Sequence, residues 1–518
     1  MDKPLLKSII NPSPAVPAPL KHASSESNSA IEKKGGWGRS LLFGALASIA
    51  FLWVALYNGY PTVFSDTGGY LWTGLFHIAL APFRAPGYSV FTHVTSLGKT
   101  AWLTVALQAV IVVYGLRETC AYLIRGESKF VDRCFLAAVC VLATATSMSW
   151  LTSLVMPDVF AGVMFLSAFL LTSSGELRAV QRLSLAGILA LSMGTHMSLF
   201  PIAALYAAAV VVFRYIEDRR FCRFPAPRPT LAWLLVPMIA AGFWTCAQNH
   251  RMGIGFRLSP SKNTFLLGRL FGDGLAPEFL RESCPTRLFI SCNYLPNLPR
   301  TEEEFLFWHP LLQELKGHDD EIDAIVQGTL AAYPQRFLLS SFKQTWLQLA
   351  AFRTGDEIRT YGAEDWNNHA LERVFPDDSE AFWNGKQFRG RLLPLVDAVA
   401  PFHSMVFWLS VFACLLFAWT GRFARMNTFF TSAIAFLIIN AAVCGSFAGV
   451  FDRYQSRVAW IIPFCLTAYV SCFVKERAQM YAEADLTYRS ARMETRLHHP
   501  NLVRIPTHPD SENSSAAG

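Results

Sequence analysis

Charged residues are scarce in this chain of 518 residues, and their scarcity excludes most classes of soluble protein. Asp, Glu, Lys and Arg make up 16% of the residues, against about 25% in ordinary soluble domains. Hydrophobic residues reach 52%, and apolar runs recur through most of the chain. These features predict a membrane protein built from many helices rather than a series of soluble domains.

Other signals are also missing from the sequence. No cysteines stand at zinc-binding spacing, and no basic stretch is interleaved with aromatic residues. We see no internal repeat and no coiled coil. The formal net charge of +7 comes from Lys and Arg that cluster between the apolar runs, which indicates membrane topology through the positive-inside bias. A nucleic-acid partner is therefore not expected.

The apolar runs and the basic loops between them predict the fold class. We expect an all-α polytopic membrane protein with about ten transmembrane helices and an inserted, mixed or mainly helical extracytoplasmic domain. The expected spans are Ser40–Tyr57, Ala101–Gly115, Cys134–Trp150, Val159–Thr172, two spans between Leu183 and Phe213, Leu231–Ala247, Leu395–Trp419, Thr428–Phe447 and Val458–Phe473.

This topology divides the chain into five parts. Residues 1–39 are a Pro- and Ser-rich tail that we expect to be disordered and cytoplasmic, and residues 40–247 form an N-terminal membrane bundle whose first outer loop is 58–100. Residues 248–394 form the extracytoplasmic domain, 395–474 the C-terminal membrane helices, and 475–518 a cytoplasmic tail. We expect a multi-pass protein of a bacterial inner membrane with both termini in the cytoplasm.

Two features of the expected outer domain need the structure to decide them. Most of the 11 cysteines lie in apolar runs, where a thiol packs as a small hydrophobic group, but Cys284 and Cys292 lie in the outer segment. They form a disulfide or remain free, depending on local geometry. The segment Pro334–Phe352 is apolar but interrupted by polar residues, so we expect a helix lying in the membrane interface.

The first outer loop carries an acid and a base. Asp66 precedes a short apolar and aromatic segment, and Arg84 stands in the rigid turn Arg84-Ala85-Pro86-Gly87-Tyr88. A carboxylate and a guanidinium beside a membrane surface indicate chemistry or ligand binding. The alternative is structural, because Asp is a favoured residue at the start of a helix and a helix is expected from Thr67.

Further ionisable side chains gather on the expected outer face, each with a structural alternative. Arg453 and Arg457 run against the positive-inside bias and suit a phosphate, but they also suit Asp452 or ordinary lipid phosphates. Asp158 follows Pro157 at a helix start, where a carboxylate is common. His196 lies in a turn and fits a packed or hydrogen-bonded residue. These residues do not compose a metal site, although a divalent metal remains open.

The outer-face motifs resemble the glycosyltransferase-C superfamily, whose polytopic members take sugars from polyprenyl-phosphate lipids and include protein mannosyltransferases and lipid A aminoarabinose transferases. The resemblance spans about Ser40 to Lys475 through short motifs. They are Asp66 with Tyr70-Leu71, Arg84-Ala85-Pro86-Gly87-Tyr88, Pro157-Asp158, and Arg453-Tyr454 before a last span that contains Pro463. This chain differs in having one acid rather than two in the first loop, and in an outer domain that is inserted rather than C-terminal.

The resemblance implies an inverting glycosyltransferase with a polyprenyl-phosphate-linked sugar as donor and an unassigned envelope acceptor. Asp66 corresponds to the catalytic base, and Arg84, Arg453 and Arg457 correspond to groups that hold the donor phosphate. Possible supporting residues are Tyr70, Tyr88, Asp158, His196 and Tyr454. The competing functions are a membrane transporter or a lipid or polysaccharide flippase, and a structural or assembly protein of the envelope. Transport would place ionisable groups along a path at mid-membrane depth.

Overall fold

A computed structural model describes residues 25–76, 84–220, 231–259, 261, 263–356, 358–362 and 364–498 of the chain. Within these residues the fold is helical, and the only β-structure is an isolated parallel bridge between Thr62 and Leu154. The all-α prediction is confirmed for this part of the chain. Of the tails expected to be disordered or polar, 1–24 and 499–518 lie outside the described residues, whereas 25–39 form the start of a helix.

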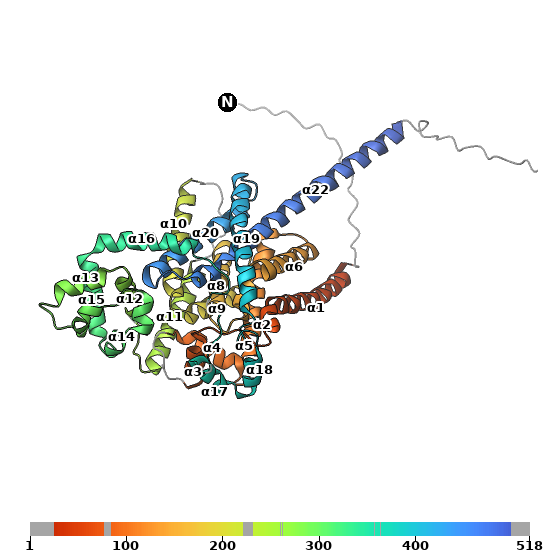
Figure 1. The fold of residues 1–518 in the computed structure, drawn as a ribbon. Helices are drawn as coiled ribbons and strands as arrows, with labels where there is room; N and C mark the ends of the chain where they lie inside the picture. Colours follow the sequence, from red (N-terminus) through yellow and green to blue (C-terminus); the bar gives the residue numbers. More distant parts are fainter. Residues whose placement is uncertain are drawn as a thin grey trace, which may run out of the picture.

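The helices follow one another along the chain as Figure 1 shows. In the first half of the chain they are α1 (Ser25–Phe51), α2 (Trp53–Asn58), α3 (Thr67–Phe76), α4 (Pro86–Ser96), α5 (Ala101–Ile124), α6 (Ser128–Ala145), α7 (Met148–Ser153), α8 (Val159–Ser173), α9 (Ala179–Thr195), α10 (Leu199–Arg220) and α11 (Ala232–Arg251). In the second half they are α12 (Thr264–Gly272), α13 (Leu275–Ser283), the 3-10 helix η1 (Ile290–Asn297), the π-helix η2 (Glu304–Trp308), α14 (Leu311–Glu314), α15 (Asp319–Ala332), α16 (Pro334–Ala350), α17 (Trp366–Val374), the 3-10 helix η3 (Pro376–Asp378), α18 (Ser379–Asn384), α19 (Leu393–Trp419), α20 (Ala424–Phe447), α21 (Asp452–Ala459) and α22 (Ile461–His498).

Helix α8 forms the centre of the bundle. Its side chains from Val159 to Thr172 are buried, and it contacts α5, α9, α10, α11, α20 and α21. Gly162 lets Trp460 lie against the α8 backbone, since a Cβ at Gly162 would come within 2.2 Å of the indole ring. An apolar helix surrounded on all sides explains why this run shows no amphipathic pattern in the sequence.

Four helical stretches in the described residues are long and apolar enough to cross a membrane, rather than the expected number of about ten. They are Ala101–Ile124, Leu393–Trp419, Ala424–Phe447 and the stretch Asp452–Ser490. Three further apolar helices, Gly38–Phe51, Val159–Ser173 and Leu199–Phe213, are shorter. Because a straight crossing needs about 20 residues, counting apolar runs includes helices that are too short to cross alone. The four long stretches indicate a membrane protein.

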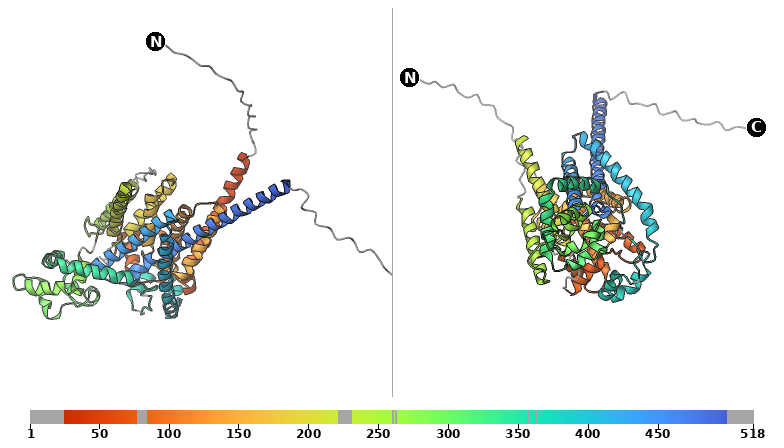
Figure 2. Two further views of the ribbon diagram at one scale, coloured as in Figure 1. Left: turned by 90° about the horizontal axis from the view of Figure 1, so that it is seen from above. Right: turned by 60° about the vertical axis from the view of Figure 1, so that its left-hand side comes forward.

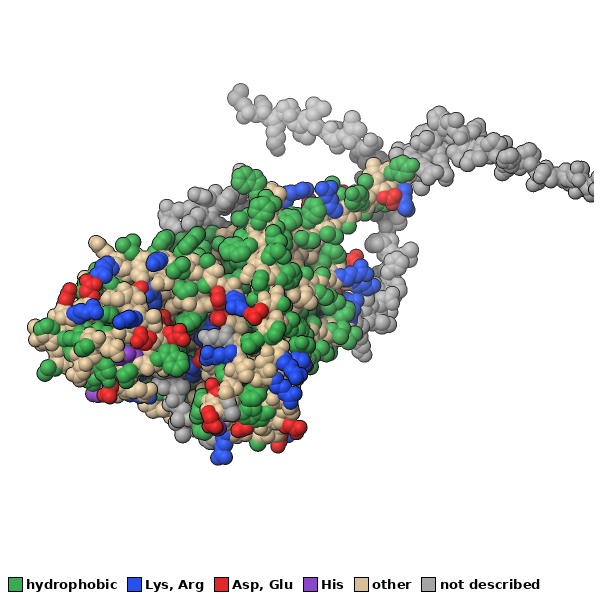
Figure 3. All heavy atoms as spheres, viewed as in Figure 1, with side chains coloured by type: hydrophobic (Ala, Val, Ile, Leu, Met, Phe, Trp, Pro, Cys, Tyr) green, Lys and Arg blue, Asp and Glu red, His purple; other side chains and the backbone are tan. Residues whose placement is uncertain are grey.

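Helix α19 carries a broad exposed apolar surface. Hydrophobic side chains gather over this helix in the space-filling view (Figure 3). The exposed side chains include Phe402, Met405, Trp408, Leu409, Phe412, Leu415, Leu416 and Trp419. A soluble protein would bury such a surface against another element, so this face is suited to lipid. The long helix α22 extends away from the bundle beyond the part that packs against α19 and α6 (Figures 1 and 2).

The segment expected to be one outer domain forms two separate parts. Helices α12 to α15 build a lobe, residues 264–333, with its own hydrophobic core around Leu270, Phe305 and Ile325. This lobe lies at one end of the molecule (Figures 1 and 2). Helices α17 and α18 instead share a core with the first outer loop, through Leu371 and Phe382 packed near Val63 and Tyr60. The second part therefore supports the loop that contains Asp66.

Helix α16 connects the lobe to the bundle and packs along α20 (Figure 1). Its outward face exposes Leu338, Leu339, Phe342 and Trp346. The helix spans 17 residues and has a polar opposite side that includes the buried Gln348, whose side chain bonds Phe451. This pattern matches the amphipathic helix expected from the sequence and is suited to a membrane interface.

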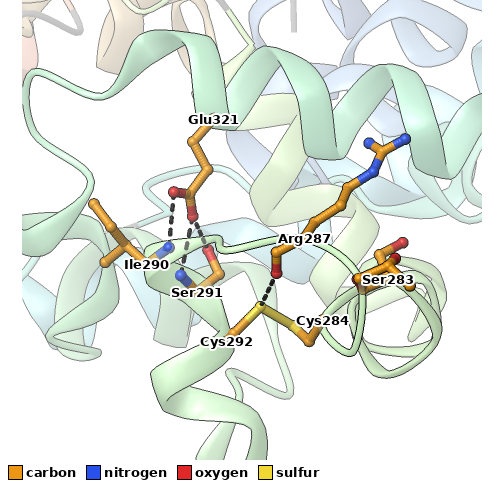
Figure 4. The surroundings of a disulfide bond; sticks show 8 residues. Ser283, Cys284, Arg287, Ile290, Ser291, Cys292 and Glu321 are labelled. Carbon is orange, nitrogen blue, oxygen red and sulfur yellow. Dashed lines mark hydrogen bonds between the residues drawn. A yellow bond between two sulfur atoms is a disulfide. The ribbon is translucent and has the colours of Figure 1, made fainter.

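Cys284 and Cys292 are joined by a disulfide in the lobe (Figure 4), with their Cα atoms 5.6 Å apart. The bridge closes the loop between α13 and η1. The carboxylate of Glu321 in α15 lies beside this bridge and accepts hydrogen bonds from the backbone N–H groups of Ile290 and Ser291 at the start of η1, at 2.8 Å and 2.9 Å. Of the two alternatives left open by the sequence, a disulfide or two free thiols, the structure has the disulfide.

Replacing both bridged cysteines by serine is expected to lower the stability of the lobe by about 2–3 kcal/mol, because the chain-entropy model assigns that much to closing so short a loop. Non-reducing peptide mapping checks the bond in the purified protein, and denaturant unfolding measures its effect. Cys140→Ser, which removes an exposed free thiol, serves as the control. Recovery of both thiols free from the native protein would reject the bridge.

Candidate functional site

A cavity of about 430 Å³ lies where the first outer loop, the lobe and the last helices meet. Its walls come from 64–70, Arg84, the α9–α10 turn, residues 258, 259, 261, 263, 265 and 266, the segment 302–307, the end of α20 and the start of α21. Most of the lining side chains are apolar or aromatic, and the acidic and basic ones among the described residues are Asp66, Arg84, His196, Glu302 and Arg453. A cavity of this size with few polar groups has the form of a site for an amphiphilic ligand.

Asp66 is held between two arginines in this cavity. Its Oδ1 lies 2.5 Å from Arg84 Nη2, and its Oδ2 lies 3.4 Å from Arg453 Nη1. The three side chains are each 15–17% exposed. Although Asp66 directly precedes α3, its carboxylate oxygens face these guanidinium groups, so the helix-start alternative does not account for the side chain. The structure brings together the acid and two of the three arginines expected from the sequence.

Arg453 is positioned by contacts on every side. Its backbone N–H donates to Asp356 Oδ2 at 3.0 Å, and its guanidinium lies 4.4 Å from the centre of the Phe64 ring and 5.0 Å from that of Tyr454. Aromatic faces attract a guanidinium without occupying its hydrogen-bond donors. Arg453 also hydrogen-bonds the Tyr454 side chain and pairs with Asp66, and it lines the cavity, where an anion can take the place of Asp66.

Two expected supporting tyrosines lie behind Asp66 and Arg84. The guanidinium of Arg84 lies 5.9 Å from the centre of the Tyr70 ring, and Tyr70 meets Tyr88 edge to face at 5.1 Å. The Tyr88 hydroxyl donates to Gln108 Oε1 at 2.6 Å. Burial raises the pKa of Tyr70, so its hydroxyl stays protonated. Tyr70 lines the cavity, whereas Tyr88 is packed deeper and supports it.

His196 lines the cavity from the α9–α10 turn. Its Nδ1 accepts a hydrogen bond from the backbone N–H of Ser198 at 3.2 Å and lies 2.9 Å from the Ser198 hydroxyl. Burial, followed by the guanidinium groups of Arg457, Arg453 and Arg84, lowers the pKa of His196 well below its ordinary value. His196 is therefore a neutral residue of the turn, which matches the structural alternative, and it adds no charge to the cavity.

Arg457 and Asp158 form a separate buried pair and do not line the cavity. Arg457 is fully buried, and its Nη2 donates to Asn440 Oδ1 at 2.9 Å and to Ser198 Oγ at 3.0 Å. Its Nη1 lies 3.9 Å from Asp158 Oδ1. Asp158 precedes α8 but forms no capping hydrogen bond. The expectation that Arg457 contacts a donor phosphate does not fit this placement, because neighbouring helices already surround the side chain.

Tyr454 connects the two arginines. The centre of its ring lies 5.0 Å from the Arg453 guanidinium and 5.2 Å from the Arg457 guanidinium, and it meets His196 edge to face. Tyr454 lines the cavity, as expected for a supporting residue.

Several residues that form or support the site are not among those expected from the sequence. Asp356 anchors the Arg453 backbone, and Asn367 Oδ1 accepts a hydrogen bond from the Gly68 N–H at 2.6 Å. Glu302 reaches the cavity from the lobe. All three lie between residues 248 and 394, and nothing in a single sequence pairs Asp356 with Arg453, 97 positions away, or Asn367 with Gly68, 299 positions away. In the described part of the chain no cluster of three or more His, Cys, Asp or Glu side chains is placed to hold a metal ion.

Comparison of the chain with protein-family models, with curated proteins and with solved structures gave no match. The interpretation of the site therefore depends on its geometry. In this mainly apolar cavity, an incoming anion can replace the carboxylate as the partner of the two guanidinium groups, and the freed carboxylate can then accept a proton.

Proposed function

We propose that this protein is an integral membrane glycosyltransferase that transfers a sugar from a polyprenyl-phosphate lipid donor to an envelope acceptor on the extracytoplasmic face. The observation that carries the proposal is the placement of Asp66 between Arg84 and Arg453 in a mainly apolar cavity. The arginines are suited to a phosphate through charge-assisted hydrogen bonds, and the apolar walls are suited to a lipid chain. The sequence resemblance to the glycosyltransferase-C superfamily supports the same reaction.

In this proposal the donor phosphate takes over the guanidinium groups and frees the carboxylate. Asp66 then removes the proton from the acceptor hydroxyl, whose oxygen forms a bond to the anomeric carbon as the bond from that carbon to the phosphate oxygen breaks. The lipid phosphate leaves with the electron pair, and Arg84 and Arg453 stabilise its charge. A single displacement inverts the anomeric centre. No metal is needed for these steps, although the proposal does not depend on its absence.

We propose that the protein lies in the inner membrane of a bacterial cell. Both termini would be in the cytoplasm, and residues 248–394 would be on the extracytoplasmic side. The support is the basic loops between apolar runs and the disulfide in the lobe, because disulfides persist in oxidising compartments. A total of about ten passes would require the shorter apolar helices to cross with tilting or local thinning of the bilayer. Accessibility labelling that finds residues near Arg219 and near Asp365 on the same side would overturn this arrangement.

The test of the function supplies the purified protein with a panel of polyprenyl-phosphate sugars and with membrane extract as acceptor, and follows release of the lipid phosphate and labelling of the acceptor. Sugar transfer with inversion supports the proposal. Absence of turnover with every donor would favour a transporter or lipid flippase instead.

The second candidate is a transporter or lipid flippase, which the buried pair of Asp158 and Arg457 favours. Ionisable groups enclosed among helices can mark a substrate or ion path. Substrate counterflow in proteoliposomes without formation of a glycosylated product would establish this function in place of transfer.

Arg453→Ala is expected to weaken binding of the phosphate-bearing donor by about 10- to 100-fold, because a charge-assisted hydrogen bond contributes about 1.5–3 kcal/mol. The interaction exists in both the ground and the transition state, so KM should rise more than kcat falls. Titration calorimetry in detergent micelles measures the affinity. Arg336→Ala removes an exposed arginine of α16 that pairs with Glu278 and should leave binding unchanged. Equal affinity in wild type and Arg453→Ala would contradict the assignment.

A further inference from the structure

A second carboxyl group, that of Glu302, belongs to the same cavity as Asp66 but comes from a distant part of the chain. Glu302 stands just before η2, in the part of the lobe that also lines the cavity with Leu306 and Phe307. The cavity therefore contains one acid from the first outer loop, Asp66, and one from the lobe, Glu302. The proposed reaction uses only Asp66.

Two glycines make room for the Glu302 side chain. A Cβ at Gly449, between α20 and α21, would come within 2.0 Å of Glu302 Oε2, and a Cβ at Gly268 in α12 would lie 3.3 Å from its Cγ. Gly449 also has a φ of +128°, which residues with a Cβ rarely adopt. The carboxyl group is thus held at the junction of the lobe and the last helices rather than free in solvent.

No described residue forms a hydrogen bond or an ion pair with the Glu302 side chain. Its charged neighbours are Arg269 on α12 and Asp273 directly after that helix, which pair with each other at 2.5 Å. Tyr454 faces it from α21. Burial raises the pKa of Glu302 to about 8, while Arg269 acts to lower it and Asp273 to raise it. Near neutral pH the group is therefore a carboxylic acid, which is a hydrogen-bond donor.

The charges that line the cavity show what this protonation does. Arg84 and Arg453 contribute two positive charges and Asp66 one negative charge, while His196 is neutral. With Glu302 protonated, the lining therefore carries one net positive charge. When Glu302 ionises, the lining becomes neutral, and a second negative charge faces any anion that enters. A low-dielectric setting strengthens this repulsion.

We propose that Glu302 is a ligand-binding residue of the cavity that acts as a neutral carboxylic acid and donates a hydrogen bond to an oxygen of a phosphate-bearing lipid. The ligand would be a phosphate ester with one negative charge. This charge matches the one net positive charge that the cavity lining carries when Glu302 is protonated. The inference rests on the proposed function for the identity of the ligand, but it concerns binding and not transfer. A carboxyl group kept neutral by its surroundings so that it can donate a hydrogen bond is established protein chemistry.

The experiment measures binding of a short-chain polyprenyl phosphate methyl ester between pH 7 and pH 9. The ester has no second phosphate ionisation, so its own charge stays constant in this range. Wild type is expected to lose about 10-fold in affinity, which is the fall in the fraction of protonated Glu302 for a pKa of about 8. Glu302→Gln is neutral at every pH and still donates, so it should bind as wild type does at pH 7 and show no dependence on pH.

Glu302→Ala removes the donor and should bind more weakly at pH 7, again without pH dependence. Inorganic phosphate provides a second arm, since its binding at the same site would show that the headgroup alone is recognised. Equal pH dependence in wild type and Glu302→Gln, or pH-independent binding in wild type, would overturn the proposal. If binding depends on Glu302 but the protein transfers no sugar, the role of Glu302 in binding stands and the proposed reaction is rejected. If the protein transfers sugar but binding does not depend on pH, the proposed reaction stands and the role of Glu302 is rejected.

Thermal unfolding gives a second readout. The ordinary pKa of the carboxyl is 4.5 and the folded value is about 8, so between these values the folded chain holds a proton that the unfolded chain has released. Stability should therefore fall as pH rises through this window and then level off above pH 8. Glu302→Gln should lack this component of the pH dependence, and its melting point also reports whether the variant folds.

Discussion

Asp66→Asn is expected to lower the rate of sugar transfer by about 10²- to 10⁴-fold, the usual contribution of a general base, while donor binding persists. The amide keeps the size of the carboxyl and can still accept a hydrogen bond from Arg84 or Arg453, so the cavity should keep its shape. It cannot accept the proton of the acceptor hydroxyl. Single-turnover transfer, followed beside calorimetric binding of the donor, separates the two effects.

A matched control for this variant is Asp397→Asn. Asp397 also pairs with an arginine, Arg353, at 2.5 Å, but both side chains are exposed and neither oxygen reaches the main cavity. Its transfer rate should equal that of wild type. Full activity in Asp66→Asn would exclude the role of general base and leave Asp66 as a partner that orients the two arginines.

Arg457→Ala is expected to destabilise the fold by about 3–5 kcal/mol, because it leaves Asp158 buried without its cation. Arg457 is fully buried and Asp158 is 2% exposed, so water cannot replace the lost partner. The change also removes the hydrogen bonds to Asn440 and Ser198 that connect α21 with α20 and with the α9–α10 turn. Denaturant unfolding in detergent micelles measures the loss.

The double variant Asp158→Leu/Arg457→Met separates the charge from the packing. Removing both charges should recover much of the stability lost in Arg457→Ala, because replacing a buried ion pair by apolar groups of similar volume is often neutral. Arg422→Ala, which breaks an exposed pair with Glu476, should cost no more than about 1 kcal/mol. A stable Arg457→Ala variant that has lost donor binding would instead restore Arg457 to the phosphate site.

Local regularities in the sequence were sufficient for the class of fold and for part of the site. Low charge and long apolar runs determine a helical membrane protein, since period and composition act within a few turns of chain. Asp66 and Arg84 lie only 18 positions apart, on either side of α3, so their ion pair joins residues that are close in the sequence. The same is true of Cys284 and Cys292, which are 8 positions apart. The helix α16 is also expected from its own residues, and its exposed apolar face is in the structure.

Only the tertiary structure decided how distant residues meet. Asp66 and Arg453 are separated by 387 positions, and Glu302 reaches the cavity because Gly449 and Gly268 leave space for it. Arg453 and Arg457 stand one turn apart and look equivalent in the sequence, yet one faces the cavity and the other is enclosed by α20 and the α9–α10 turn. The apolar run of α8 fits a membrane span by composition, but the helix is short and other helices surround it. The physical reason is the same in each case: a residue's own neighbours in the chain set its local conformation, but the side chains that face it depend on how whole helices pack.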